Sequence, residues 1–102
     1  MTTYPFIIKS EALEEFIEAI LWYEDQQDGL GKIFSEKFYS KLVKVCKNPL
    51  HYRSFYKKYH EALVDTFPFL IVYFIDEEKL TIIVVAIFHT SRNPKNKFRK
   101  LK

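Results

Sequence analysis

Residues 67–89 read FPFLIVYFIDEEKLTIIVVAIFH, and this stretch decides the fold class. The apolar runs at 70–75 and 80–88 are rich in β-branched and aromatic residues, which is typical of buried strands. The polar residues between them, Asp76-Glu77-Glu78-Lys79, are few enough for a hairpin loop, although the Asn-Gly signal is missing. We therefore predict antiparallel strands at 69–76 and 79–88, entered by a turn at Phe67-Pro68-Phe69.

Upstream of these strands the apolar residues recur with a helical period. They predict two amphipathic helices, at about 11–26 and 30–47, with Ser10 as the N-cap of the first. Gln27-Asp28-Gly29 separates the helices, and Asn48-Pro49 ends the second. Because the gap is short, we expect an antiparallel helical hairpin.

Two more strands complete the predicted sheet. Residues 4–9 are typical of a short edge strand, since Pro5 has no N–H to donate. Residues 59–65 alternate weakly, and 50–58 are expected to form a loop or an irregular strand. The predicted fold is α+β with the order β-α-α-β-β-β, a helical hairpin packed on one face of a small, mostly antiparallel sheet.

Length and composition limit the classes of protein to consider. The 102 residues suit a single domain, and a composition of 48% hydrophobic and 28% charged residues excludes intrinsic disorder. The single Cys46 and three dispersed histidines offer neither a disulfide nor a metal cluster, so we expect no metal and no cofactor. We see no secretory signal and no apolar stretch approaching the roughly 20 residues of a membrane span. We therefore expect a cytoplasmic protein without membrane contact.

The net charge of +3 comes from the C-terminal tail. Residues 92–102 hold six basic residues and no acidic one, whereas residues 1–91 hold ten basic and thirteen acidic residues. The tail is either a solvated segment or one attracted to nucleic acid or to an acidic partner.

Basic and aromatic residues alternate most densely in the segment 51–60. Its candidates for binding nucleic acid or a protein target are Arg53, Tyr56, Lys57, Lys58 and His60. Cations contact phosphates and rings stack on bases, so this mixture suits a nucleic-acid surface. The alternative is a loop anchored by its rings, with solvated lysines.

His89 and Arg92 follow the last predicted strand. Metal-free RNA cleavage needs a base, an acid and cations around the phosphate, so these two residues are the catalytic candidates if the protein is a nuclease. Alternatively, His89 hydrogen-bonds the strand end and Arg92 pairs with a carboxylate. Trp22 falls among glutamates on the helical wheel, and it either packs under the loop of the helical hairpin or is exposed to a partner.

Several short motifs in order along the chain suggest a family. They are Trp22-Tyr23-Glu24, Gln27, Gly29-Leu30-Gly31, Phe34, Phe38, Asn48-Pro49, Ala62-Leu63-Val64, Phe67-Pro68-Phe69-Leu70-Ile71-Val72-Tyr73, Ala86-Ile87-Phe88-His89 and Ser91-Arg92-Asn93-Pro94. With these motifs the chain resembles the RelE/ParE superfamily of toxins from type II toxin–antitoxin systems, closer to the ParE-like branch. The resemblance implies a cytoplasmic toxin wrapped by a cognate antitoxin and directed at DNA topology or translation.

The sequence departs from this family at two places. Members often carry a basic pair before the Phe-Pro turn and basic residues at the start of that strand, where this chain has Asp65-Thr66 and His60-Glu61. The leading hypothesis is therefore a growth-inhibiting, plasmid-stabilising toxin that binds DNA gyrase. The alternatives are a ribosome-dependent mRNA endonuclease and a non-toxic antitoxin-binding relative, which leaves open whether the chain is an enzyme.

Both alternating sets of the last strand are apolar. Strict alternation puts Leu80, Ile82, Val84, Ala86 and Phe88 on one face, and Thr81, Ile83, Val85 and Ile87 on the other. Helices can cover only one of these faces. We expect an antitoxin segment, or a second copy of the chain in a homodimer, to cover part of the other.

Overall fold

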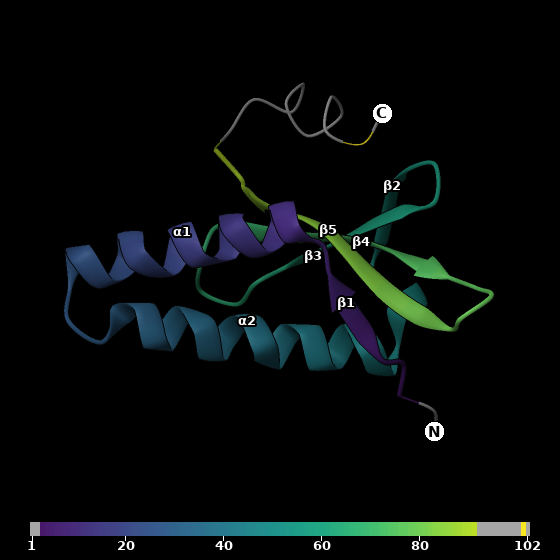
Figure 1. Cartoon of the computed structure of the whole chain (residues 1–102), viewed down its shortest axis with the longest axis horizontal. Coiled ribbons are helices and arrows are strands. Elements are labelled where there is room, and N and C mark those ends of the chain that lie inside the picture. The colour runs from purple at the N-terminus through teal and green to yellow at the C-terminus, as the bar shows by residue number, and fades with distance from the viewer. Residues whose placement is uncertain (1–2, 92–100, 102) are drawn as a thin grey trace.

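The computed structural model describes residues 3–91 and 101 and confirms the predicted α+β class. Figure 1 shows the two helices side by side along one face of a twisted sheet. The elements are β1 (Phe6–Ile8), α1 (Ser10–Gln26), α2 (Leu30–Lys47), the 3-10 turn η1 (Pro49–His51), β2 (Arg53–Tyr56), β3 (Tyr59–Leu63), β4 (Phe69–Asp76) and β5 (Thr81–His89).

The five strands lie in the order β1-β5-β4-β3-β2. β1 pairs with β5 in parallel, and the other neighbours are antiparallel, which confirms the predicted antiparallel arrangement of β3, β4 and β5. β2 adds an edge strand within the segment for which a loop or an irregular strand was expected. It is irregular, because its register with β3 shifts between Ser54 and Tyr56.

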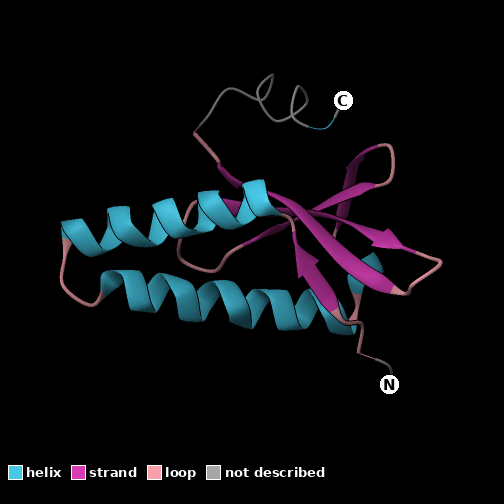
Figure 2. Cartoon of the chain, viewed as in Figure 1, coloured by secondary structure: helices cyan, strands magenta, loops and turns pink. Residues whose placement is uncertain are grey.

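The first helix begins one residue earlier than predicted. Ser10 is already helical, and the N-cap position belongs to Lys9, which makes no side-chain capping bond. The Lys9 N–H still donates to the Val84 carbonyl at 3.0 Å, so the chain leaves the sheet only after Lys9. The prediction of Ser10 as N-cap is wrong because only Lys9 separates β1 from α1 (Figure 2).

A carboxylate from α1 caps the start of α2. The Glu24 oxygens accept the backbone N–H groups of Gly29 and Gly31 at 2.9 and 3.0 Å. Gly29 has a φ of 86°, where glycine is favoured. At Gly31 the helices are so close that an added Cβ would lie 2.6 Å from the Ile20 carbonyl oxygen. The Trp-Tyr-Glu and Gly-Leu-Gly motifs therefore build the helix–helix junction.

The main core lies between the helices and the sheet. The rings of Phe16 and Phe38 are 4.2 Å apart, and those of Phe16 and Phe34 are 5.9 Å apart. They pack with buried aliphatic residues of β4 and β5, including Ile71 and Val84. Contacts between aromatic rings add to the stabilisation from buried apolar area.

A β-bulge in β5 overturns the predicted alternation of that strand. Ile87 pairs with Ile71 and Ala86 with Val72, but Val84 pairs with Tyr73, so Val85 is the extra residue. As a result Ile82, Val84 and Ile87 share the face that packs on the helices, and Ala86 and Phe88 face away from it.

The second face of the sheet carries a small apolar cluster. Val72, Ala86 and Phe88 are buried there with Leu101, and Phe55, Tyr56, Tyr59 and Val85 pack around them. The chain's own Leu101 therefore covers part of the face for which a partner was expected. The rest of the predicted basic tail, 92–100 and 102, lies outside the described residues.

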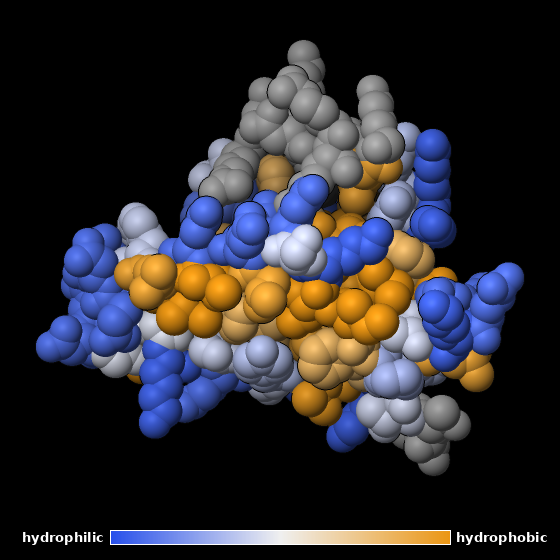
Figure 3. All heavy atoms as spheres, viewed as in Figure 1, coloured by the Kyte–Doolittle hydropathy of each residue, from blue (hydrophilic) through white to orange (hydrophobic). Residues whose placement is uncertain are grey.

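The outer surface of the helical hairpin is unexpectedly apolar. Leu13 and Ile17 of α1, with Tyr39 and Val43 of α2, are exposed although their spacing placed them in the apolar stripes. Figure 3 shows hydrophobic side chains gathering in a band over the helices. The buried stripes are therefore narrower than predicted and include positions such as Ala12 and Phe38.

We predict that Gly31→Ala destabilises the protein. The new methyl group would meet the Ile20 carbonyl oxygen, and such overpacking costs about 1–3 kcal/mol in the free energy of unfolding. Urea unfolding of this variant and of Lys32→Ala, an exposed position in the same turn, measures the cost. Equal stability of the two variants would contradict the close approach.

A second prediction concerns Tyr73, whose hydroxyl donates to the Pro49 carbonyl oxygen at 2.6 Å. Burial raises the pKa of this hydroxyl. In the unfolded chain a tyrosine ionises near pH ~10, so the free energy of unfolding falls as the pH rises through that value while folded Tyr73 keeps its proton. Tyr73→Phe should cost about 1 kcal/mol at neutral pH through the lost hydrogen bond. Its free energy of unfolding should also fall less between neutral and alkaline pH than that of wild type. The exposed control Tyr39→Phe should show the same fall as wild type. Urea unfolding at neutral and alkaline pH measures both.

Candidate functional site

The structure places all five predicted binding residues on one β-hairpin, β2–β3, with His60 in its second strand. Arg53 and Tyr56 lie on β2, and Lys57 and Lys58 form the two-residue turn into β3. Lys57 adopts a φ of 47°, which a tight turn of this kind requires. We call this element, residues 53–59, the basic hairpin.

Aromatic rings support the cations of the basic hairpin. The Lys58 Nζ lies 4.2 Å from the centroid of the Phe74 ring, and the Lys57 Nζ lies 5.2 Å from that of Tyr56. The Tyr56 and Tyr59 rings are parallel, with centroids 6.4 Å apart. Both lysines remain exposed while the rings are partly buried. The hairpin therefore exposes two lysine charges that lie against aromatic rings.

The two acidic positions that depart from the family pattern bind cations of the chain itself. Glu61, whose side chain is only 10% exposed, lies 3.7 Å from the Arg53 guanidinium. Asp65 lies 3.4 Å from the Lys41 ammonium. These ion pairs partly neutralise the positive charge beside the basic hairpin.

His60 pairs with Ser54 across the same hairpin, but its side chain faces the main core. Its ring stacks on Tyr73 at 5.4 Å, on the sheet face that meets the main core. Its Nδ1 lies 3.0 Å from the Tyr52 carbonyl oxygen, so that nitrogen carries the proton and donates it. His60 thus links β3 to the segment before β2, and it lies on the face opposite to its strand neighbour Glu61.

His89 lies at the far end of β5. Its ring meets the Phe69 ring edge-on at 5.0 Å, and its Nδ1 accepts the Ser91 N–H at 3.0 Å. Because Nδ1 is the acceptor, the proton of the neutral ring is on Nε2. This bond matches the structural alternative, in which His89 secures the strand end. Its predicted partner Arg92 lies outside the described residues.

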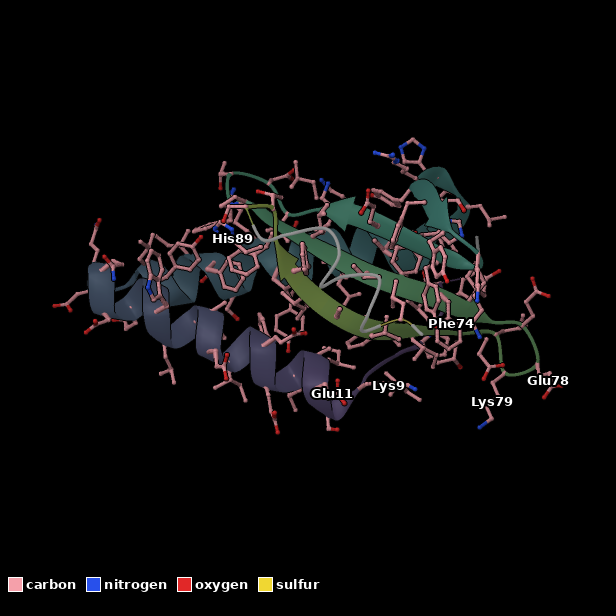
Figure 4. All side chains as sticks on the ribbon, turned by 90° about the horizontal axis from the view of Figure 1, so that it is seen from above. Lys9, Glu11, Phe74, Glu78, Lys79 and His89 are labelled. Carbon is pink, nitrogen blue, oxygen red and sulfur yellow. The ribbon has the colours of Figure 1, made fainter. Side chains whose placement is uncertain are left out.

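The basic hairpin and His89 are not brought together. Lys58 lies over Phe74, which pairs with Ile83, and six residues of extended strand separate Ile83 from His89. At the rise of a β-strand this is about 20 Å. Figure 4 shows Phe74 and His89 toward opposite ends of the sheet.

Sequence reasoning missed a pocket at the His89 end. The cavity measures about 330 Å³ and is lined by Glu15, Glu18, Ala19, Trp22, Tyr23, Phe69, Ile87, His89 and Ser91. We call it the Trp22 pocket. The spacing of Glu15, Glu18 and Trp22 on one side of α1 was a signal for it, but their proximity to the end of β5 is visible only in the fold.

Trp22 is 59% exposed, so it does not pack under the loop of the helical hairpin, and its exposure to a partner stays a prediction. Its ring meets Tyr23 edge-on, with centroids 5.1 Å apart. Burial raises the pKa of Tyr23, which therefore contributes a neutral ring. A Glu15 carboxylate oxygen accepts the Ile87 N–H at 3.1 Å and is held at the pocket wall.

Two other kinds of site were sought in the part of the chain that the structure describes. Within residues 3–91 and 101, no group of three or more His, Cys, Asp or Glu side chains is arranged to hold a metal ion. In the same residues, no helix is long and apolar enough to cross a membrane.

Comparison with known proteins supplies the family. No curated protein sequence matches the chain significantly. Among solved structures, an E. coli RelE toxin carrying two arginine-to-alanine changes, in the free state, superposes with a TM-score of 0.69 at 17% identity, over 94% of this chain and 93% of that one. The isolated E. coli RelE toxin in another crystal form gives a TM-score of 0.65 at 17% identity, over 97% and 99%. At this identity the likeness shows the fold.

The sequence profile described as "ParE toxin of type II toxin-antitoxin system, parDE" matches residues 6–94. This match covers every described helix and strand, from β1 to the end of β5. The chain therefore belongs to the ParE toxin family of type II toxin–antitoxin systems.

Proposed function

We propose that this toxin inhibits DNA gyrase by binding it, and that a cognate antitoxin neutralises it. The observation that carries the proposal is the separation of about 20 Å between the basic hairpin and His89. A toxin that acts by binding can use such distant surfaces independently, whereas a catalytic centre cannot.

Cleavage of RNA would make stricter demands on the geometry. A base, an acid and cations must all lie within hydrogen-bonding reach of one phosphate. The Nδ1 of His89 is engaged by Ser91, and His60 donates its own Nδ1 proton to the chain. Glu61 and Asp65 pair with Arg53 and Lys41, so these two cations are less available to a phosphate. These features favour binding over catalysis.

The basic hairpin is our candidate for the gyrase contact. Arg53 and Lys57 are exposed, and Tyr56 lies between them. Arginine and tyrosine dominate the binding energy of many protein interfaces, and exposed cations speed association with an acidic partner surface. A hairpin at the edge of the sheet can reach a partner without moving the core.

One observation favours a second candidate function. The same alternation of cations and rings would suit RNA, which a ribosome-dependent mRNA endonuclease must hold. In that case the basic hairpin would position the message, and catalysis would fall to residues at the His89 end of the sheet.

We predict that Lys57→Glu weakens gyrase inhibition. The change reverses one charge at the exposed tip of the hairpin, so half-inhibition of supercoiling by the purified toxin should require about tenfold more protein. Lys37→Glu, the same charge reversal on the exposed side of α2, should act like wild type.

Expression of wild-type toxin without antitoxin should arrest growth with a DNA-damage response and intact bulk mRNA.

A parallel assay on programmed ribosomes separates the alternatives. Cleavage of mRNA that disappears in His89→Ala, with gyrase unaffected, would replace the gyrase proposal by the nuclease. If wild-type protein alters neither gyrase nor mRNA and does not slow growth, the chain is a non-toxic antitoxin-binding relative.

A further inference from the structure

We infer that the outer surface of the helical hairpin binds a second copy of this chain, so that two hairpins form an antiparallel four-helix bundle. In this dimer α1 of each copy lies along α2 of the other. The inference does not depend on the target of the toxin. It combines an exposed apolar stripe, opposite charges on the two helices and a register that brings matching residues together.

Both helices contribute to the apolar stripe. Leu13, Ile17 and Leu21 follow one another at intervals of four residues, so they lie on one side of α1. Tyr39 and Val43 have the same spacing on α2. These five side chains, which we call the outer stripe, are between 42 and 63% exposed. Figure 3 shows the hydrophobic band along the helices on the side that faces the viewer. Helices commonly bury a stripe of this kind against another element.

The two helices carry opposite charges. α1 has six acidic residues and no basic one, whereas α2 has five basic residues and one acidic one. Exposed charges of both signs border the outer stripe, since Asp25 lies four residues after Leu21 and Lys32 lies seven residues before Tyr39. A partner of uniform charge would match one helix and be repelled by the other. A second copy carries both charges in the same arrangement, so it is the occupant that this surface favours.

Only one orientation of a two-fold axis pairs the opposite charges. An axis parallel to the helices and midway between them places α1 of one copy over α2 of the other, running in the opposite direction. An axis across the helices would instead place acidic α1 on acidic α1 and basic α2 on basic α2. Because like charges repel, the first orientation is favoured. It gives an antiparallel four-helix bundle with one sheet on each outer side.

The register of the dimer follows from contacts within one chain. The rings of Phe16 and Tyr39 have centroids 5.6 Å apart, so these residues lie at the same level along the hairpin. Rotation about an axis parallel to the helices keeps that level, so Ile17 of one copy meets Tyr39 of the other. One turn further along each helix, Leu13 meets Val43. The apolar residues of the outer stripe therefore face one another across the bundle.

The size of the surface predicts a weak dimer. A helix of 17 residues is about 26 Å long, and two helices side by side are about 20 Å wide. Covering this surface on both copies removes on the order of 1,000 Å² from solvent, which is the lower limit for a specific interface. We therefore expect a dimer that dissociates on dilution.

Sedimentation of the full chain over a range of concentrations tests the inference. Wild type should shift from monomer to dimer as the concentration rises. Ile17→Glu places a carboxylate in the centre of the outer stripe, so it should raise the dissociation constant of the dimer at least about tenfold. Leu63→Glu makes the same change at an exposed apolar residue of β3, and it should behave as wild type does. The inference is overturned if wild type remains monomeric, or if Ile17→Glu dimerises as well as Leu63→Glu.

Cross-linking tests the pairing of α1 with α2. A chain carrying Ile17→Cys and a separate, tagged chain carrying Tyr39→Cys should form a mixed disulfide when they are combined under mild oxidation. Ile17→Cys alone should cross-link at least about tenfold less, because the two α1 helices lie diagonally across the bundle, beyond the reach of a disulfide. The native Cys46 is buried and is present in every sample. If Ile17→Cys cross-links to itself as readily, α1 packs on α1 and the inference fails.

An exchange of charges gives a third measurement. Asp25 and Lys32 lie on either side of the loop between the helices, so Asp25 of one copy comes opposite Lys32 of the other. Asp25→Lys and Lys32→Glu should each weaken self-association several-fold, because each puts like charges together at both symmetric contacts. An equal mixture of the two variants should recover it, since the mixed dimer restores both pairs. Without recovery, the orientation that pairs α1 with α2 is refuted.

The cognate antitoxin is the competing occupant of the outer stripe. If Ile17→Glu leaves self-association unchanged but weakens antitoxin binding, the surface belongs to the antitoxin and the inference is wrong. Gyrase inhibition is measured separately, so its absence would refute the proposed function and leave the dimer standing.

Discussion

The bulge at Val85 is the constraint on which the architecture of the sheet depends. Because β5 has one extra residue, each side chain after Val85 points to the opposite face of the sheet from the one that strict alternation predicts. Ile87 is thereby directed at the helices and its N–H meets Glu15, and His89 is placed opposite Phe69. Without the bulge, Ala86 and Phe88 would enter the main core, and the end of β5 would present different side chains to α1. The Trp22 pocket is therefore a product of strand irregularity as well as of helix packing.

Much of the fold was predictable because its signals are local. The helices follow from apolar spacing, the end of α2 from Asn48-Pro49, and β4 and β5 from their β-branched runs. The bulge left no such signal, since both alternating sets of β5 are apolar and no polar residue marks the reversal. The exposed Leu13 and Ile17 were misplaced for a similar reason: an apolar residue on a helix does not reveal whether it lies against the sheet.

The candidate sites also differ in whether their residues are close together in the sequence. The basic hairpin was found from sequence because its residues are neighbours in the chain. His60 was grouped with them, but strand alternation turns it toward Tyr73 and the core. The Trp22 pocket joins α1 to the end of β5, about 70 residues away in sequence, as the hydrogen bond between Glu15 and Ile87 shows. No pattern within one segment could predict that these two elements meet, although the position of Trp22 among glutamates indicated the side of α1 that lines the pocket.

The parallel pairing of β1 with β5 also governs the order in which the protein can be made. Phe6 pairs with Ile82, so the first strand has no partner until most of the chain has been synthesised. The helical hairpin and the β2–β3–β4 meander involve nearby residues and can form earlier, whereas contacts distant in sequence close slowly. A ribosome making this chain therefore carries β1 without its sheet partner until residues 82–84 have been synthesised. The Trp22 pocket likewise forms only when the end of β5, with Ile87 and His89, docks against α1.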